Sequence, residues 1–199
     1  MNRKELGYAA RKVLHVAFNI SIGVIILLVP LEWIKPLTVA GFVLILIFES
    51  LRLKTRAKSL VQETVGMLFK KEEAIEYSGL FWVGVGALII ALFANPIAIS
   101  YGFFILALAD TAASLAGKAW GHKPFYLNKT WVGSAMFFAI AFLITAFFIT
   151  LGHFVLPAYT TALLLALLLT LAEAFAYPFD DNFIVLVVAT FLMNLALKL

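Results

Sequence analysis

An aspartate inside an apolar helix is followed, between residues 106 and 134, by a loop rich in lysine. The loop carries these basic side chains: Lys118, His122, Lys123 and Lys129. An ionised carboxylate within a bilayer costs on the order of 3 kcal/mol, so Asp110 is expected to have a functional partner, a cation or a metal. Lysine ammonium groups bind phosphates as point charges, and a helix beginning near Thr130 adds backbone N–H groups. This stretch therefore predicts a phosphate site.

The first apolar helix carries a polar stripe. Its members recur at intervals of four and so share one helical face: Arg11, His15, Asn19 and Gly23, with Lys12 beside the first of them. His15 is either a hydrogen-bonded packing residue or part of a site. The adjoining Arg-Lys pair is either a phosphate contact or a positive anchor at the membrane surface.

A third polar group lies where two later apolar segments meet. Glu173 ends one of them, and Asp180, Asp181 and Asn182 turn the chain into the next. Carboxylate and amide oxygens are the ligands that Mg²⁺ uses when it also binds phosphate. These residues and Asp110 are therefore candidate metal ligands. The alternative is a solvated turn whose Asp or Asn caps the last helix.

Two acidic residues also have structural interpretations. Asp110 shares a helical face with Lys118, which allows a salt bridge between them. Glu49 and Arg52 are three residues apart, and an ion pair between them would make a buried acid tolerable. A neighbouring stripe of small residues, Ala109, Ala113 and Gly117, favours close helix packing.

Composition indicates an all-α, polytopic membrane bundle. Hydrophobic residues make up 64% of the 199 residues, 13% are charged, and the mean hydropathy is +1.04. We expect a single domain, residues 1–199, with about seven transmembrane helices. Their predicted ranges are 13–29, 34–51, 79–94, 96–116, 131–151, 156–176 and 183–197. The absence of cysteine removes thiol nucleophiles and thiolate metal sites.

The distribution of positive charge predicts the orientation. Of the fifteen lysines and arginines, all but Lys35 and Lys198 fall on the side of the N-terminus when seven spans are assumed. The N-terminus and the polar residues are therefore expected on the cytoplasmic side. This explains the net charge of +4 better than nucleic-acid binding does. Residues 54–78 are expected to form an amphipathic helix at the interface, which is either a surface connection or a lipid-presenting gate.

Five collinear segments resemble the CTP-dependent lipid-alcohol kinases, a family that includes dolichol kinase, phytol kinase and CTP-using diacylglycerol kinase. The longest is ALADTAASLAGKAWGHKPFYLNKTWVGSAMFF (107–138), and three others are RKVLH (11–15), FESLR (48–52) and AEAFAYPFDDN (172–182). LFKKEEAIEYSG (68–79) also agrees in order. The resemblance spans most of the chain.

The resemblance implies transfer of the γ-phosphate of CTP to a lipid hydroxyl, with Mg²⁺. It implies signature or functional roles for these residues: Arg11, Lys12, Asp110, Gly117, Lys118, Lys129, Thr130, Asp181 and Asn182. Asp110, Lys118, Lys129 and His15 are the expected catalytic residues, with the proton acceptor either a carboxylate or His15. Glu173 and Asp180 complete the candidate metal ligands.

Three positions depart from the family pattern. Ala109 replaces the usual Gly before Asp110, Asn128 replaces the first Lys of the last motif, and Val132 replaces its Glu. If that Glu binds metal or nucleotide in relatives, either Glu173, Asp180 or Asp181 is expected to take its place, or this chain is expected to be weak at that step.

Two other functions stay open. A CTP:phosphatidate cytidylyltransferase would use the same nucleotide but attack its α-phosphate. A transporter or scaffold would spread polar groups through the membrane depth, whereas here they gather toward one face. The resemblance implies that the acceptor is a polyprenol, a phytol-type alcohol or diacylglycerol. The expected partners are CTP, that alcohol and membrane lipids, and formation of a homo-oligomer is open.

Overall fold

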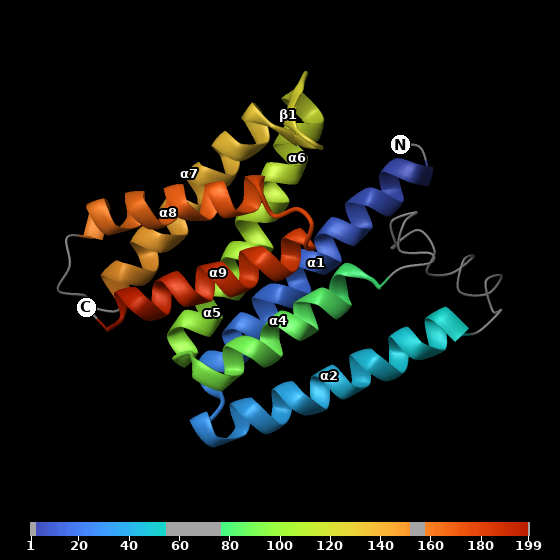
Figure 1. Cartoon of the computed structure of the whole chain (residues 1–199), viewed down its shortest axis with the longest axis vertical. Helices are drawn as coiled ribbons and strands as arrows, with labels where there is room; N and C mark the ends of the chain where they lie inside the picture. Colours follow the sequence, from blue (N-terminus) through green and yellow to red (C-terminus); the bar gives the residue numbers. More distant parts are fainter. Residues whose placement is uncertain (1–2, 55–76, 152–157, 199) are drawn as a thin grey trace.

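The protein is a bundle of helices with one small β-hairpin (Figure 1), as seen in a computed structural model that describes residues 3–54, 77–151 and 158–198. The helices are α1 (Arg3–Leu28), α2 (Leu31–Lys54), α4 (Gly79–Phe93), α5 (Pro96–Phe104), α6 (Thr111–Trp120), α7 (Trp131–Leu151), α8 (Ala158–Ala174) and α9 (Asp181–Ala196). A π-helical turn, η3 (Ile105–Asp110), joins α5 to α6. The predicted all-α class is confirmed.

Four helical stretches are long and apolar enough to cross a membrane: Leu6–Leu28, Leu31–Leu53, Pro96–Trp120 and Trp131–Thr150. Three further apolar helices are shorter, at 15 to 17 residues: α4, α8 and α9. About 20 residues are needed to cross a hydrocarbon core of about 30 Å. The chain is therefore a membrane protein with at least four candidate spans in its described part.

Six of the seven predicted apolar segments each correspond to one helix, whereas segment 96–116 corresponds to α5, the π-helical turn and α6 in succession. The first helix begins earlier than predicted. It starts at Arg3 rather than at residue 13, so the charged residues before the apolar run are helical too. The predicted interfacial helix, residues 54–78, lies almost entirely outside the described residues. Between α6 and α7 the structure has an antiparallel hairpin that the sequence did not predict, formed by β1 (Pro124–Tyr126) and β2 (Lys129–Thr130).

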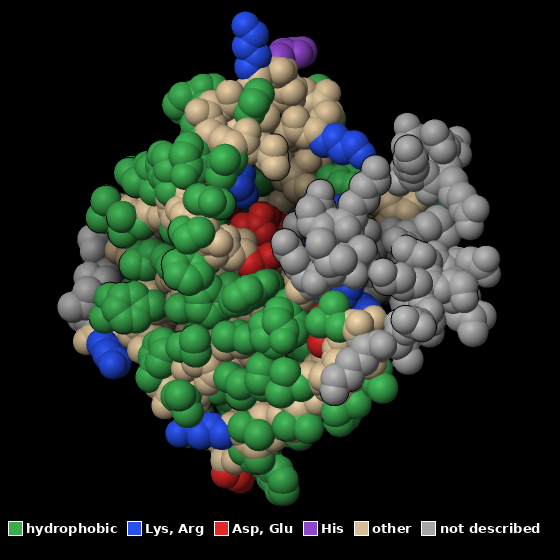
Figure 2. All heavy atoms as spheres, turned by 45° about the vertical axis from the view of Figure 1, so that its right-hand side comes forward, with side chains coloured by type: hydrophobic (Ala, Val, Ile, Leu, Met, Phe, Trp, Pro, Cys, Tyr) green, Lys and Arg blue, Asp and Glu red, His purple; other side chains and the backbone are tan. Residues whose placement is uncertain are grey.

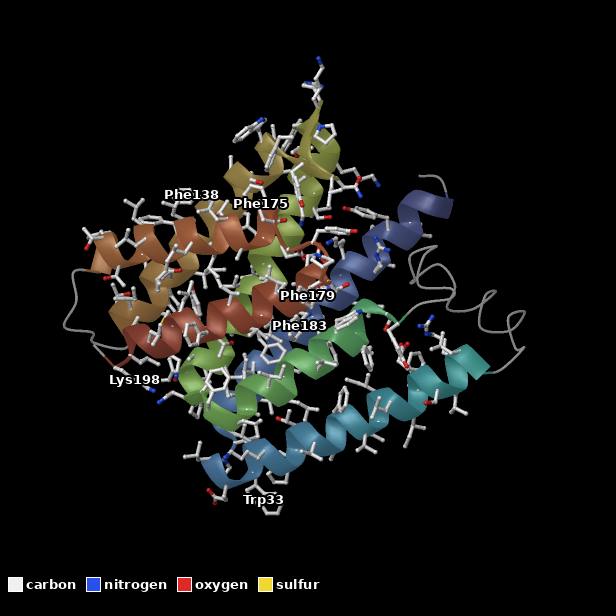
Figure 3. All side chains as sticks on the ribbon, viewed as in Figure 1. Trp33, Phe138, Phe175, Phe179, Phe183 and Lys198 are labelled. Carbon is white, nitrogen blue, oxygen red and sulfur yellow. The ribbon has the colours of Figure 1, made fainter. Side chains whose placement is uncertain are left out.

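The helices pack in neighbouring pairs around a core of large apolar side chains. α7 packs against α8, α1 against α5, and α4 and α5 against α9, while α2 lies along α4 at the outer edge of the bundle (Figure 1). A Cβ on Gly102 would lie 2.2 Å from Thr190 Oγ1, so only glycine permits the close crossing of α5 and α9. Phe183 of α9 packs against Trp82 of α4, with ring centroids 6.1 Å apart, and is labelled beside Phe179 in Figure 3.

Glu49 ties the end of α2 to the beginning of α4. Its carboxylate is 2.6 Å from Arg52 Nη2, which confirms the predicted ion pair. The hydroxyl of Ser78 donates to the other carboxylate oxygen at 2.7 Å. Only 1% of Glu49 is exposed, so these bonds compensate an otherwise costly buried charge. This arrangement supports the structural interpretation of Glu49.

Candidate functional site

One end of the bundle contains a cavity of about 830 Å³ into which most of the predicted site residues project. Its walls come from α1, the start of α4, α6, the hairpin and the start of α7, the end of α8 and the start of α9. The predicted residues that line it are Arg11, Lys12, His15, Asp110, Gly117, Lys118, Lys129, Thr130, Glu173, Asp181 and Asn182. In Figure 2 acidic side chains lie in a recess of a largely apolar face, with basic side chains beside them.

Asp110 pairs with α1 rather than with its own helix. Its Oδ2 lies 3.4 Å from Lys12 Nζ and 3.8 Å from His15 Nε2. The predicted alternative, a salt bridge with Lys118, is not formed. Asp110 closes the π-helical turn, and only 8% of it is exposed. Such turns widen a helix by one residue and are frequent at functional sites.

The ring of His15 is held in one tautomer. Its Nε2 lies 3.1 Å from the carbonyl oxygen of Leu106, and a carbonyl can only accept a hydrogen bond. Nε2 is therefore the protonated nitrogen. In the neutral ring this leaves Nδ1 able to accept a proton. Asn19, one turn further along α1, donates to the His15 carbonyl at 2.8 Å.

Lys129 joins the hairpin to α8 and α9. Its ammonium group donates to Glu173 and lies 3.4 Å from Asp181 Oδ2. Burial lowers the pKa of Lys129, but the charges of Asp181 and Glu173 and the bond to Glu173, with a smaller contribution from Asp110, raise it above its ordinary value overall. Lys129 is therefore a permanent cation at neutral pH.

Local packing aims Lys129 and Thr130 into the cavity. Tyr126 in β1 packs against Phe175 at the end of α8, with ring centroids 5.2 Å apart. The hairpin turn places Leu127 at φ 47°, a left-handed conformation uncommon for leucine. Thr130 Oγ1 accepts from the N–H of Gly133, so Thr130 caps α7. The helix begins at Trp131, next to Thr130, as predicted.

Glycine lets α6 approach this cap. A Cβ on Gly117 would lie 2.9 Å from Thr130 Oγ1, and one on Gly133 would lie 3.0 Å from the Ala113 carbonyl. Only residues without a side chain allow the α6–α7 crossing to be this close. The N-terminus of α7 therefore faces the cavity beside Lys118 and Lys129, where its backbone dipole favours an anion.

Tyr8 is a site residue that sequence reasoning missed. Its ring centroid lies 3.7 Å from Lys118 Nζ, a cation–π contact, and 5.5 Å from Arg11 Cζ. Its hydroxyl is 2.9 Å from Ser114 Oγ. Tyr8 precedes the apolar run, and no spacing rule connects it to α6, so it could not be identified from the sequence.

Several predicted residues lie elsewhere. Asp180 is absent from the cavity lining and caps α9, where its Oδ1 accepts from the backbone and side-chain N–H groups of Asn182 at 3.0 and 2.8 Å. Lys123 is exposed and also absent from the lining. Val132 is 36% exposed outside the cavity, so its departure from the family pattern removes no cavity ligand.

The carboxylates of the cavity suit a Mg²⁺ ion that is also bound by phosphate oxygens. They do not suit a metal that is held by protein side chains alone. Among residues 3–54, 77–151 and 158–198 no three or more His, Asp or Glu side chains are grouped closely enough to hold a metal. Glu173 Oε2 is buried and has no hydrogen-bond partner among the described residues, which suits an added cation. Mg²⁺ commonly takes one or two carboxylates together with substrate phosphates.

The chain is similar to two curated proteins, both named CTP-dependent diacylglycerol kinase 1. It is 32% identical to that of Eremothecium gossypii over 125 residues, which covers 61% of this chain and 38% of the relative. It is 28% identical to that of Saccharomyces cerevisiae over 212 residues, covering 91% of this chain and 72% of the relative. The predicted resemblance to CTP-dependent lipid kinases is confirmed. No family model matches the chain, and no solved structure matches it.

Proposed function

We propose that this chain is a CTP-dependent kinase that transfers the γ-phosphate of CTP to the hydroxyl of a membrane lipid alcohol. The observation that carries the proposal is the cavity, where Lys12, Lys118 and Lys129 from three separate elements meet Asp110 and Glu173. The names of both relatives supply the donor, CTP, and favour diacylglycerol among the acceptors. A polyprenol and a phytol-type alcohol are the other acceptors to be compared.

Phosphoryl transfer needs charge neutralisation and in-line positioning more than covalent chemistry. In this proposal Lys118 and Arg11 bind the phosphates together with the N-terminus of α7. Lys129 and Lys12 keep the carboxylates of the cavity in place. His15 Nδ1 is the nitrogen that accepts the proton of the lipid hydroxyl, since Asp110 already accepts from Lys12.

One or two of the carboxylates of Asp110, Glu173 and Asp181 would hold Mg²⁺ together with phosphate oxygens of the nucleotide. When bound, the ion would neutralise charge on the transferring phosphate. Asn182 lies beside Asp181 in the cavity and offers a neutral amide for the nucleotide. Asp180 is proposed to act indirectly, because its carboxylate fixes the amide of Asn182.

We further propose seven spans, a cytoplasmic N-terminus and a cytoplasmic active face. With seven antiparallel spans, the helix ends that line the cavity all lie on the same side of the membrane as the start of α1. Trp33 and Lys198 lie at the other end of the bundle from the hairpin (Figure 3). Trp33 is 57% exposed, as expected of an aromatic anchor at the opposite interface.

The test is the fate of a radioactive label. Protein purified in detergent is mixed with Mg²⁺, diacylglycerol and CTP labelled at either the α- or the γ-phosphate. We expect γ-label in the lipid and release of CDP. Recovery of α-label in lipid from phosphatidate, with release of pyrophosphate, would replace the kinase with a cytidylyltransferase. Absence of CTP turnover with every lipid alcohol would favour the transporter or scaffold.

Tyr8 provides a second prediction. Replacing it with leucine removes the ring beneath Lys118, and we expect the KM for CTP to rise about fivefold to tenfold, since a cation–π contact is worth roughly 1 kcal/mol or somewhat more. Tyr8→Phe keeps the ring but loses the bond to Ser114, so it should stay within about threefold of the original protein. Equal KM values in both variants would contradict a role for the ring.

A further inference from the structure

A second cavity, apolar and of about 420 Å³, lies directly against the polar one. Three residues line both cavities: Phe18, Leu80 and Val83. The rest of the second lining comes from the facing sides of α1, α2, α4 and α5, and Thr38 carries its one hydroxyl. The cavity volume falls within the roughly 300–1,000 Å³ that small-molecule sites occupy.

The helix arrangement explains why this space exists. α1 and α2 are joined by a very short connection but diverge from it (Figure 1). α1 packs along α5 and α2 packs along α4, so the inner sides of α1 and α2 are left apart. Ile25 and Leu37 face this space and are each about half exposed. In a bilayer such a space holds hydrocarbon rather than water.

The change from polar to apolar lining occurs at the same place on two walls. On α1, Asn19 lines only the polar cavity, whereas its neighbour Phe18 lines both. At the start of α4, the preceding residue Ser78 lines only the polar cavity, and Leu80 lines both. A molecule that spans this boundary has a polar end among Asn19 and His15 and a hydrocarbon end between α1 and α2.

We propose that the second cavity binds the hydrocarbon chain of the acceptor lipid and so places its hydroxyl in the polar cavity. This inference rests on the proposed function for the identity of the acceptor. The occupant is a lipid alcohol rather than a phospholipid, because a hydroxyl headgroup fits the boundary without placing a second phosphate against Asp110 and Glu173. Phe18, Leu80 and Val83 are specificity residues at the junction of the two cavities.

Gly41 offers a way to fill the cavity without disturbing the bundle. It lines the apolar cavity, and a Cβ built on it would meet no atom within 4 Å. By contrast, a Cβ on Gly84 would lie 2.9 Å from the Phe42 ring, so that position is unsuitable. Val43, two residues along α2, is 47% exposed and outside the cavity, which makes Val43→Phe a matched control for Gly41→Phe.

The experiment uses a diacylglycerol with a photoreactive diazirine in one acyl chain, in nanodiscs of phosphatidylcholine. We expect labelling of α1, α2 and α4 peptides, competition by unlabelled diacylglycerol, and about tenfold weaker labelling in Gly41→Phe, the effect of displacing roughly two methylene groups from apolar contact. Val43→Phe should label like the original protein. Thermal stabilisation by Mg²⁺–CTP, measured in parallel, should be equal in both variants.

Two results would overturn the inference. In the first, the probe labels Gly41→Phe as strongly as the original protein. In the second, phosphatidylcholine competes with the probe as well as unlabelled diacylglycerol does. Neither result concerns phosphate transfer, which is scored separately with γ-labelled CTP. Specific labelling without phosphate transfer would refute the proposed kinase but support the lipid site. Phosphate transfer that is insensitive to Gly41→Phe for both long-chain and short-chain acceptors would support the kinase but refute this lipid site.

Discussion

Replacing Asp110 with asparagine is expected to lower CTP turnover by about 10²–10³-fold while the protein stays folded. Asparagine has nearly the same shape as aspartate and can still accept a hydrogen bond from Lys12. What it loses is the negative charge, and with it one proposed ligand for Mg²⁺. Losses of this size are typical when one charged or donor group is removed from a preorganised site. Turnover is measured with γ-labelled CTP and diacylglycerol, and folding by thermal denaturation in detergent.

Thr111→Val is the matched control for this variant. Thr111 follows Asp110 directly as the first residue of α6, is 7% exposed, and its buried hydroxyl has no hydrogen-bond partner among the described residues. Valine has a similar shape, so wild-type turnover is expected. Asp110→Asn turnover within threefold of the original would remove Asp110 from the site. If Asp110→Asn fails to fold, the double variant Lys12→Gln with Asp110→Asn tests whether the unpaired charge of Lys12 is the cause. If it is, the double variant should fold and remain inactive.

The helices could be predicted from the sequence because each contains a long apolar run that lipid or other helices can cover. Their ends were harder to predict. Hydropathy detects the part of α1 that is apolar, but the helix continues back to Arg3 through residues that prefer water. The hairpin was missed because its strands are three and two residues long, and its turn, Leu127–Asn128, lacks the glycine that signals a tight hairpin.

The membership of the site was largely predictable, but its pairings were not. Spacing along one helix suggested Asp110 with Lys118, whereas the structure pairs Asp110 with Lys12, 98 positions away. Periodicity relates only residues that are close in sequence, so it cannot reveal which helices become neighbours. Lys118 instead contacts Tyr8, a residue that carries no charge and belongs to no motif. The Glu49–Arg52 pair was predictable because it is local.

The position of Val132 shows why a departure from a family pattern needs a structure to interpret it. By sequence it is the missing acid of a motif whose first Lys is also replaced, by Asn128. In the fold it is exposed on the outer side of α7, while Thr130 and Gly133 on either side of it face the cavity. Because successive residues of a helix point about 100° apart, adjacent motif positions serve different surfaces. The carboxylates of the cavity come from Asp110, Glu173 and Asp181 instead.

Lys129→Met is expected to destabilise the protein by about 3 kcal/mol, the low end of the range for breaking a buried ion pair. Glu173 is only 3% exposed, and without Lys129 its carboxylate is buried near Asp181 and Asp110 without the cation that pairs with it. About a quarter of the Lys129 side chain is exposed, which keeps the loss from being larger. The matched variant is Lys129→Met with Glu173→Gln, which removes both charges. It should recover most of the stability but not CTP turnover, because both the cation of Lys129 and the proposed Mg²⁺ ligand Glu173 are missing.

The pH dependence of the destabilisation caused by Lys129→Met follows from the raised pKa of Lys129. A lysine whose pKa is raised by folding stabilises the folded state fully below its unfolded value, 10.5, and loses that contribution as the pH rises through the folded value. The stability difference between the original protein and Lys129→Met should therefore be constant from pH 7 to 9 and shrink only above about 10.5. Denaturation in detergent at several pH values measures it. If the stability difference between the original protein and Lys129→Met already declines between pH 7 and 9, the ammonium of Lys129 is not held by Glu173 and Asp181. The ion pair would then not be the contact that joins the hairpin to α8 and α9.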